Sequence, residues 1–288
     1  MHWVIYIFGS GLAFFLGLLC ALMALAVAGG RWRGWPRVST ILALLGISLV
    51  VVSGTPLPIW YYVLAIAILT AWLIAIRLPA KVTPRRAQGL RLLAATVLLG
   101  GAAFELQYQL SPTVLPVTGR QLYLFGDSLS AGFDEHEPNH WPELLARSHQ
   151  LELSNYARPG ANVSVALRQA NEASLGDGLV LLEIGGNDVL GSTGSAEFAR
   201  DLEKLLGRVC HPGRHVVMFE LPLPPLYNEF GRVQRRLAAQ YDVLLIPKRV
   251  LVDVIARDGA TLDSIHLTER GHQRMAEVVW RVIEPAYE

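Results

Sequence analysis

The chain has 288 residues, of which 52% are hydrophobic, and its formal net charge is +1. That total combines two unlike parts. Residues 1–110 hold eight Lys or Arg and one acidic residue, a net charge of +7, whereas the remainder holds 17 basic and 23 acidic residues, a net charge of −6. Such asymmetry indicates two physical environments. Because the basic residues of the first part are confined to two short loops in an apolar region, we expect no nucleic-acid partner.

Four apolar segments fill the first 110 residues. A helix that crosses a bilayer needs about 20 mainly apolar residues. The fourth segment has only 13 uninterrupted apolar residues, Leu92–Phe104, and must include Glu105 to reach a full span. We therefore expect an α-helical transmembrane region of about four helices, at about residues 3–28, 38–57, 59–76 and 92–110.

The basic residues orient these helices. All eight lie in residues 31–37 and 77–91, and the positive-inside rule places both loops in the cytoplasm. A signal peptide is the alternative for the first segment, but no Lys or Arg precedes Arg31 and the apolar run is too long. We expect a multi-pass protein of the bacterial inner (cell) membrane, with the chain beyond the fourth helix in the periplasm.

Two further features of the sequence are structural. The tripeptide GSG at residues 9–11 is expected to help the first helix pack against its neighbours. Cys20 lies in the membrane region and Cys210 in the polar remainder, so we expect no disulfide between them.

The pattern changes at about residue 118 to short apolar strands alternating with amphipathic helices. Strands separated by helices predict a parallel sheet covered on both faces. Residues 118–288 are long enough for one α/β domain with a full core. The expected strands are Gln121–Phe125, Leu151–Tyr156, Leu179–Ile184, His215–Leu221 and Val243–Ile246. The expected helices are Trp141–Ser148, Val163–Ala170, Ala196–Val209, Gly231–Tyr241 and Thr268–Ile283, with Thr268 as the N-cap of the last.

Chemically useful residues follow three of these strands. Ser128 follows the first strand in GDS, Gly160 follows the second in ARPGAN, and Asn187 follows the third in GGND. Asp263 and His266 lie in DSIH, before the last helix. Each motif also has a plainer interpretation, as turn glycines, helix caps or a surface histidine. Because ligands of open α/β sheets bind at the carboxyl ends of the strands, we expect these residues to meet in one site.

These residue types together suit acyl transfer. The Ser128 hydroxyl becomes a nucleophile when a base such as His266 removes its proton. Asp263, three residues before His266, would fix the tautomer and orientation of the imidazole. The backbone N–H groups of Ser128 and Gly160 and the side-chain amide of Asn187 would form an oxyanion hole.

The motifs GDSLS, the PG of ARPGAN, GGND and DSIH resemble the four sequence blocks of the SGNH, or GDSL, hydrolases, in the same order over about residues 119–285. The sequence is most similar to the periplasmic thioesterase–lysophospholipase branch, which has similar GDSLSAG, ELGGND and LP…YN features. The resemblance implies a three-layer, flavodoxin-like α/β domain with a central parallel sheet and the catalytic set named above. Two departures are Ser264, where many members have Gly, and the membrane region, which that branch lacks.

We therefore expect a membrane-anchored serine hydrolase that cleaves carboxylic or thio-esters of a small molecule, lipid or glycan, with no cofactor and no metal. An extracytoplasmic O-acyltransferase or deacetylase acting on glycan esters remains open, because it would begin with the same acyl-enzyme. A non-catalytic binding module is the alternative from another class, and the complete set of site residues argues against it. The sequence does not indicate the oligomeric state.

Three histidines outside these motifs need an interpretation. His136 and His140 have a helical i, i+4 spacing, but Pro138 lies between them, which favours a polar loop over a metal site. His272 lies in the last helix and is expected to be a capping or surface residue.

Overall fold

The computed structural model describes residues 2–28, 35–78, 82–131, 140–256, 261 and 267–288. The chain divides into two compact units. The α/β unit comprises Met1–Tyr6, Tyr108–Leu223 and Glu229–Glu288, and the helical unit comprises Ile7–Gln107 and Pro224–Asn228.

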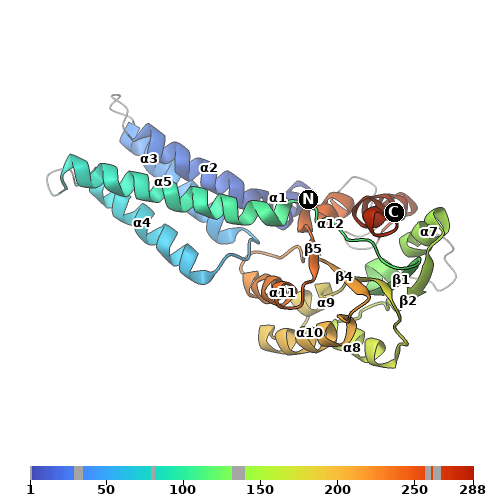
Figure 1. Ribbon diagram of the computed structural model, residues 1–288. Helices are drawn as coiled ribbons and strands as arrows, with labels where there is room; N and C mark the ends of the chain where they lie inside the picture. The colour runs from blue at the N-terminus through green and yellow to red at the C-terminus, as the bar shows by residue number, and fades with distance from the viewer. Residues whose placement is uncertain (1, 29–34, 79–81, 132–139, 257–260, 262–266) are drawn as a thin grey trace. The chain divides into compact units, whose positions relative to one another are not determined.

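Most of the described part of the first 110 residues is helical (Figure 1). The elements are α1 (His2–Gly9), α2 (Leu12–Val27), α3 (Trp35–Val52), α4 (Ile59–Arg77), α5 (Pro84–Leu106) and the 3₁₀ turn η1 (Gln107–Gln109).

The expected first helix, 3–28, is not continuous. It breaks at Ser10 and Gly11, where Gly11 has φ 86° and the Ser10 Oγ accepts a hydrogen bond from the Leu12 N–H at 3.3 Å. The GSG tripeptide thus interrupts the helix, and its three residues are buried. Close packing of α2 on α3 occurs at Gly17 and Gly46, since a Cβ on Gly46 would lie 2.7 Å from the Gly17 carbonyl oxygen.

The fourth expected helix, 92–110, begins earlier than predicted. Thr83 caps α5 by accepting a hydrogen bond from the Arg86 N–H at 3.4 Å, and Pro84 occupies the first turn. In the described residues, two helices are long and apolar enough to cross a membrane, Ile59–Arg77 and Pro84–Gln109. The apolar helices Leu12–Val27 and Pro36–Val52 are shorter than this, so the structure does not confirm all four expected spans.

The α/β unit contains a sheet of five parallel strands in the order β2-β1-β3-β4-β5. The predicted parallel sheet is therefore confirmed, with each strand within two residues of its predicted ends. The strands are β1 (Gln121–Gly126), β2 (Glu152–Asn155), β3 (Gly178–Glu183), β4 (Arg214–Phe219) and β5 (Leu244–Ile246).

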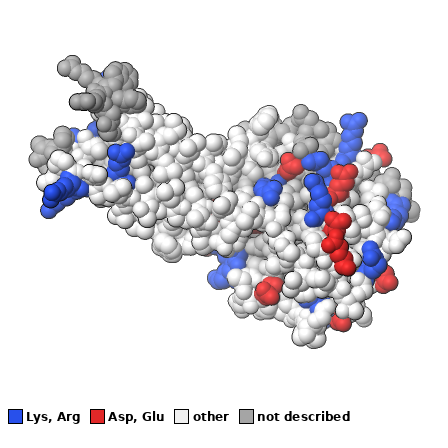
Figure 2. Space-filling view, turned by 45° about the horizontal axis from the view of Figure 1, so that its top comes forward, with Lys and Arg blue, Asp and Glu red and all other residues white. Residues whose placement is uncertain are grey.

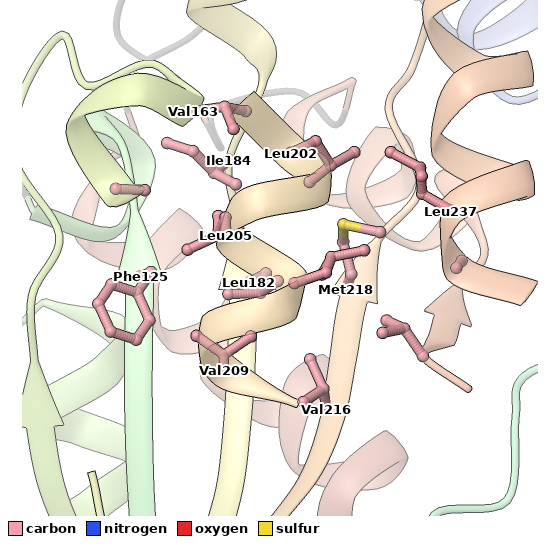
Figure 3. Packing of buried hydrophobic residues seen from close by; sticks show 14 of the residues in the cluster. Phe125, Val163, Leu182, Ile184, Leu202, Leu205, Val209, Val216, Met218 and Leu237 are labelled. Carbon is pink, nitrogen blue, oxygen red and sulfur yellow. The ribbon is translucent and has the colours of Figure 1, made fainter. Parts of the chain in front are cut away.

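Helices cover both faces of this sheet. Side chains alternate along each strand, so Leu122 and Leu124 of β1 join the core under α7, α12 and α13, while Tyr123 and Phe125 join the core under α8, α10 and α11. Figure 3 shows part of the second core, where Leu205 of α10 lies among side chains of the strands. The helices and one terminal 3₁₀ turn are α6 (Ser128–Ala131), α7 (Trp141–His149), α8 (Val163–Glu172), α9 (Gly186–Leu190), α10 (Ser195–Val209), α11 (Asn228–Gln240), α12 (Lys248–Ile255), α13 (Glu269–Ile283) and η2 (Glu284–Ala286).

The strand order places a topological switch point in the sheet. From β1 the chain moves to β2 on one side, and then returns to β3 on the other side of β1. In open α/β sheets, ligands bind outside the carboxyl ends of the strands at such a point. The segments after β1 and β3 are therefore where a functional site is expected.

Candidate active site

Ser128 stands at the carboxyl end of β1, as the first residue of α6. The turn is tight, because a Cβ on Gly126 would lie 2.7 Å from the Cβ of Ser130. Asp127 is buried and its Oδ1 accepts a hydrogen bond from the Leu129 N–H at 3.0 Å, which fixes the start of α6. Ser128 is partly exposed between these buried neighbours, so its hydroxyl belongs to the surface at the switch point.

Gly160 occupies a turn attached to the same strand end. The Arg158 N–H donates to the Gly126 carbonyl at 3.1 Å, and the Ala161 N–H donates to the Arg158 carbonyl at 3.1 Å. Pro159 and Gly160 are the two central residues, and Gly160 has φ 73°, the pattern of a type II turn. Only glycine adopts this φ without strain, so the turn requires Gly160.

Asn187 joins the two preceding turns. It lies in α9, directly after β3, and is partly exposed. Its Nδ2 donates to the Ala161 carbonyl at 2.8 Å and lies 3.5 Å from Asp127 Oδ2. The amide of Asn187 thus contacts the residue after Gly160 and the residue before Ser128. The structure brings these three candidate residues together at one edge of the sheet.

Asp188 holds the Gly160 segment in place. It is buried, and its Oδ2 accepts a hydrogen bond from the Val163 N–H at 2.9 Å, at the start of α8. Burial raises the pKa of Asp188, and the hydrogen bond from Val163 opposes that rise. The interpretation of the GGND polar residues as helix caps therefore fits Asp188, whereas Asn187 donates to a loop carbonyl.

Glu183 was not predicted to belong to this site. It is the last residue of β3 and is buried, with 4% of its surface exposed. Its Oε2 accepts a hydrogen bond from Ser130 Oγ at 2.8 Å, and its carbonyl accepts one from the Asp127 N–H at 3.2 Å. Glu183 therefore supports the turn that carries Ser128. The signal in the sequence was a single acidic residue inside the otherwise apolar run Leu179–Ile184.

The protonation of Glu183 predicts a pH-dependent stability. Burial, and then the nearby Asp127 charge, raise the pKa of Glu183 well above its ordinary value of 4.5. Above that ordinary value the folded chain binds more protons than the unfolded chain, so the free energy of unfolding falls as pH rises toward the folded pKa. Glu183→Gln keeps the shape but removes this contribution. Melting curves in detergent, from about pH 5 to about pH 8, should show a smaller loss of stability in Glu183→Gln. Identical pH dependence in the two proteins would contradict the raised pKa.

Asp263 and His266 lie outside the described residues. The residues on either side of that segment are described: Thr261 and Leu267 form an isolated antiparallel bridge. Thr268 caps α13 as predicted, accepting a hydrogen bond from the Gly271 N–H at 3.2 Å. The assignment of Asp263 and His266 to the site stays a prediction.

His272 is not a surface residue. It is buried, and its Nδ1 accepts a hydrogen bond from the Trp141 N–H at 3.3 Å, so it caps the first turn of α7 from α13. The Trp141 indole N–H in turn donates to the Leu129 carbonyl of α6 at 3.0 Å. His140 lies just before α7 and is also buried, beside His272, with 5.4 Å between ring centroids. His136 lies outside the described residues, which contain no group of three or more potential metal-ligating side chains.

The fold and these turns define a class of protein. A parallel sheet of this order, with a serine after β1 and an amide donor after β3 at its switch point, suits a hydrolase that uses a serine nucleophile. Residues 124–274, just over half of the chain, match the GDSL-like lipase/acylhydrolase family. The chain belongs to this family and is an ester-hydrolysing serine hydrolase.

Three named relatives illustrate the similarity. Esterase TesA of Pseudomonas aeruginosa is 29% identical over 177 residues, which cover 57% of this chain and 88% of that protein. The thioesterase 1/protease 1/lysophospholipase L1 of Escherichia coli is 31% identical over 138 residues, which cover 44% of this chain and 65% of that protein. An arylesterase of Vibrio mimicus is also similar, with 29% identity over 140 residues, 44% of this chain and 70% of that protein.

Solved structures resemble the same region. The crystal structure of TesA matches with a TM-score of 0.52 and 27% identity, over 58% of this chain and 99% of that one. The esterase EstA of a Pseudoalteromonas species matches with a TM-score of 0.50 and 19% identity, over 58% and 97% of the two chains, and supports the fold alone. The predicted SGNH-like fold is confirmed for the α/β unit.

Proposed function

We propose that this chain is a membrane-anchored serine hydrolase that cleaves carboxylic or thio-esters through an acyl-enzyme on Ser128. The observation that carries the proposal is the pair of contacts made by the side-chain amide of Asn187. Its amide bonds the carbonyl after Gly160 and lies 3.5 Å from the carboxylate before Ser128. Three elements distant in sequence thereby bring a hydroxyl and hydrogen-bond donors to one edge of the sheet.

The proposed reaction has two steps. Ser128 Oγ attacks the acyl carbon while His266 takes the hydroxyl proton and then delivers it to the leaving group, with Asp263 orienting His266. Negative charge on the tetrahedral intermediate is stabilised by the N–H groups of Ser128 and Gly160 and by the Asn187 amide. Water, activated by His266, then releases the acid and restores Ser128.

The substrate class follows from the relatives and from the anchor. The relatives are named as esterases, an arylesterase and a thioesterase/lysophospholipase, so we propose an ester of a small molecule, a lipid or a glycan. The same acyl-enzyme would also serve an O-acyltransferase or a deacetylase of glycan esters, which differ only in the acceptor or acyl group. No contact among the described residues of the α/β unit separates these alternatives.

We propose that residues 1–110 insert into a membrane because of the side chains exposed on the outer surface of the helical unit. In a water-soluble bundle the outward side chains would be mainly polar. Here large apolar side chains are exposed on all four of the longer helices, and Figure 2 shows a flank of the unit almost without charged side chains, with Lys and Arg gathered toward one end. The exposed apolar residues include Leu19, Met23, Ile41, Leu44, Ile59, Val63, Ile74, Leu92, Leu99 and Leu106.

The proposed topology places four helices in the bacterial inner membrane and residues 118–288 in the periplasm. Helices α4 and α5 have the length to span it, while α2 and α3 are shorter apolar helices that would complete the anchor. The basic residues before α3 and around the α4–α5 connection would stay in the cytoplasm.

Reporter fusions test this topology. Because both basic loops belong to the cytoplasmic side, a fusion after Leu115 should give active alkaline phosphatase and no fluorescence from a protein that matures only in the cytoplasm. A fusion after Arg77 should give the opposite pattern and serves as the control. Cytoplasmic fluorescence from the Leu115 fusion would place the enzyme in the cytoplasm and overturn the topology.

The purified full chain tests the activity. In detergent it should hydrolyse p-nitrophenyl esters and acyl-thioesters of increasing chain length, and the fatty acid should appear in step with p-nitrophenol. Addition of glycan acceptors separates hydrolase from transferase. Acyl-glycan replacing the released acid would establish the transferase, and turnover of neither ester class would contradict the proposed function.

A further inference from the structure

A partly open cavity of about 350 Å³ lies between α4 and α5 in the helical unit. This volume lies in the range of small-molecule pockets, roughly 300–1,000 Å³. The walls are almost entirely apolar and include Trp60, Leu64, Val97 and Phe104. Outside the α/β unit, this is therefore a preformed space suited to an apolar ligand.

Two adjacent glycines of α5 shape the cavity. Gly101 is buried against Tyr61 of α4, and a Cβ at Gly101 would overlap the Tyr61 ring. Tyr61 donates its hydroxyl proton to the Val97 carbonyl at 3.3 Å, so the polar group in the wall has a partner. Gly100 is exposed, and a Cβ there would meet nothing within 4 Å. The missing side chain at Gly100 thus leaves open space beside the close helix contact at Gly101.

The surroundings of the cavity indicate which kind of ligand it would bind. Its walls come from the two helices that are long and apolar enough to cross a membrane. The apolar surface continues outside it, since the side chains of Val63 and Leu99, which do not line the cavity, are 65% and 56% exposed. In a bilayer, such a surface is bathed by hydrocarbon chains, and a cavity with apolar walls offers them contacts that the open surface does not.

The position of the cavity along the helices is also defined. Leu57 and Pro58 line it just before α4 begins, and Phe104 lines it two residues before α5 ends. It therefore lies at the end of both helices where, through η1, the chain continues into the α/β unit. In the proposed topology this is the periplasmic end, at the level of the outer leaflet of the inner membrane.

We infer that the cavity between α4 and α5 binds one acyl chain of a bilayer phospholipid. The inference rests on the membrane insertion proposed above, and not on the identity of the ester that the α/β unit cleaves. Gly100 is the residue that keeps the space open, so a large side chain at that position should displace the lipid chain.

Photocrosslinking in nanodiscs tests the inference. The full chain is reconstituted with phosphatidylcholine that carries a diazirine near the end of one acyl chain, and labelled peptides are identified by mass spectrometry. Gly100→Phe fills the cavity. Gly89→Phe is the matched control, because Gly89 lies on the same helix, is exposed and does not line the cavity.

The expected result is adducts on Trp60–Leu64 and Val97–Phe104 in the wild-type chain and in Gly89→Phe. In Gly100→Phe these adducts should fall by about tenfold, which corresponds to about 1.4 kcal/mol of binding free energy. If Gly100→Phe does not fold, Gly100→Leu should give a smaller loss in a chain whose melting temperature is retained.

Two outcomes would overturn the inference, and they differ in cause. Equal adducts on the cavity walls in wild type and in both folded variants would mean that the lipid contacts the helices without occupying the cavity. Absence of adducts throughout α4 and α5, together with release of the native protein from membranes by alkaline carbonate, would mean that the helical unit is not inserted. Ester hydrolysis in detergent is measured in parallel and reports on the proposed function separately.

Discussion

Replacing Ser128 by Ala should abolish ester hydrolysis and labelling by a fluorophosphonate probe, because Ser128 supplies the attacking oxygen and no other group would form the covalent intermediate. The fall in kcat should reach the limit of detection, at least about 10³-fold. Ser128 is partly exposed at the edge of the sheet, so its loss should change the melting temperature little. Labelling and melting curves of the full chain in detergent measure both effects.

Ser130 provides the matched control for Ser128. It lies two residues away in α6, is fully buried, and donates to Glu183 Oε2 at 2.8 Å. Ser130→Ala should therefore lower the free energy of unfolding, by about 1 kcal/mol, while labelling of Ser128 continues. Retained labelling in Ser128→Ala, or its loss only in Ser130→Ala, would remove Ser128 from its proposed role.

Replacing Asn187 by Ala should lower kcat by about 10²–10³-fold, the usual effect of losing one oxyanion donor. Ser128 itself remains in place, so labelling should continue, at a lower rate. KM should change less than kcat, because the amide would bond the oxyanion more strongly than the ground-state carbonyl.

A structural role for Asn187 predicts a different result. Its Nδ2 donates to the Ala161 carbonyl at 2.8 Å, so Asn187→Ala could act by releasing the Gly160 turn. Asn162→Ala tests this, because Asn162 caps α8 in the same segment through the Val165 N–H at 3.1 Å and supplies no proposed oxyanion donor. It should cost about 1 kcal/mol of stability with little loss of kcat. Equal losses of kcat in the two variants would make Asn187 a positioning residue.

The α/β fold could be predicted from the sequence because the patterns that specify its strands and longer helices are local. The central strands β1, β3 and β4 are largely buried on both faces and contain short apolar runs, as in Leu179–Ile184, and a helix separates each strand of the sheet from the next. The same pattern fails for short elements. Helix α6 has four residues and α9 has five, too few for a helical period to appear, and α12 follows β5 directly after Pro247.

Glu183 and His272 show what local patterns leave out at the site. Ser128, Gly160 and Asn187 were predicted because each follows a strand, and strand ends meet at one edge. Glu183 acts through Ser130, and His272 acts through Trp141, which is 131 residues away in sequence. Such partners are set by tertiary packing. In the sequence, Glu183 is marked only as a polar residue within an apolar run, and this pattern does not identify its partner.

The helix ends in the first 110 residues were misjudged for a different reason. Hydropathy measures the apolar run and not the backbone. It joined α1 to α2 across Ser10 and Gly11, where the positive φ of Gly11 ends the helical path. It also started the fourth helix at the first apolar residue, although Thr83 and Pro84 form an N-terminal capping signal eight residues earlier.

Trapping of the acyl-enzyme tests the proposed mechanism most directly. The full chain in detergent is mixed with a p-nitrophenyl ester and quenched in acid within the first turnover, and its peptides are mapped by mass spectrometry. The acyl group should be found on the Ser128 hydroxyl, and a burst of p-nitrophenol of about one equivalent should accompany it. An acyl group on any other side chain, formed at the rate of turnover, would contradict a mechanism through Ser128.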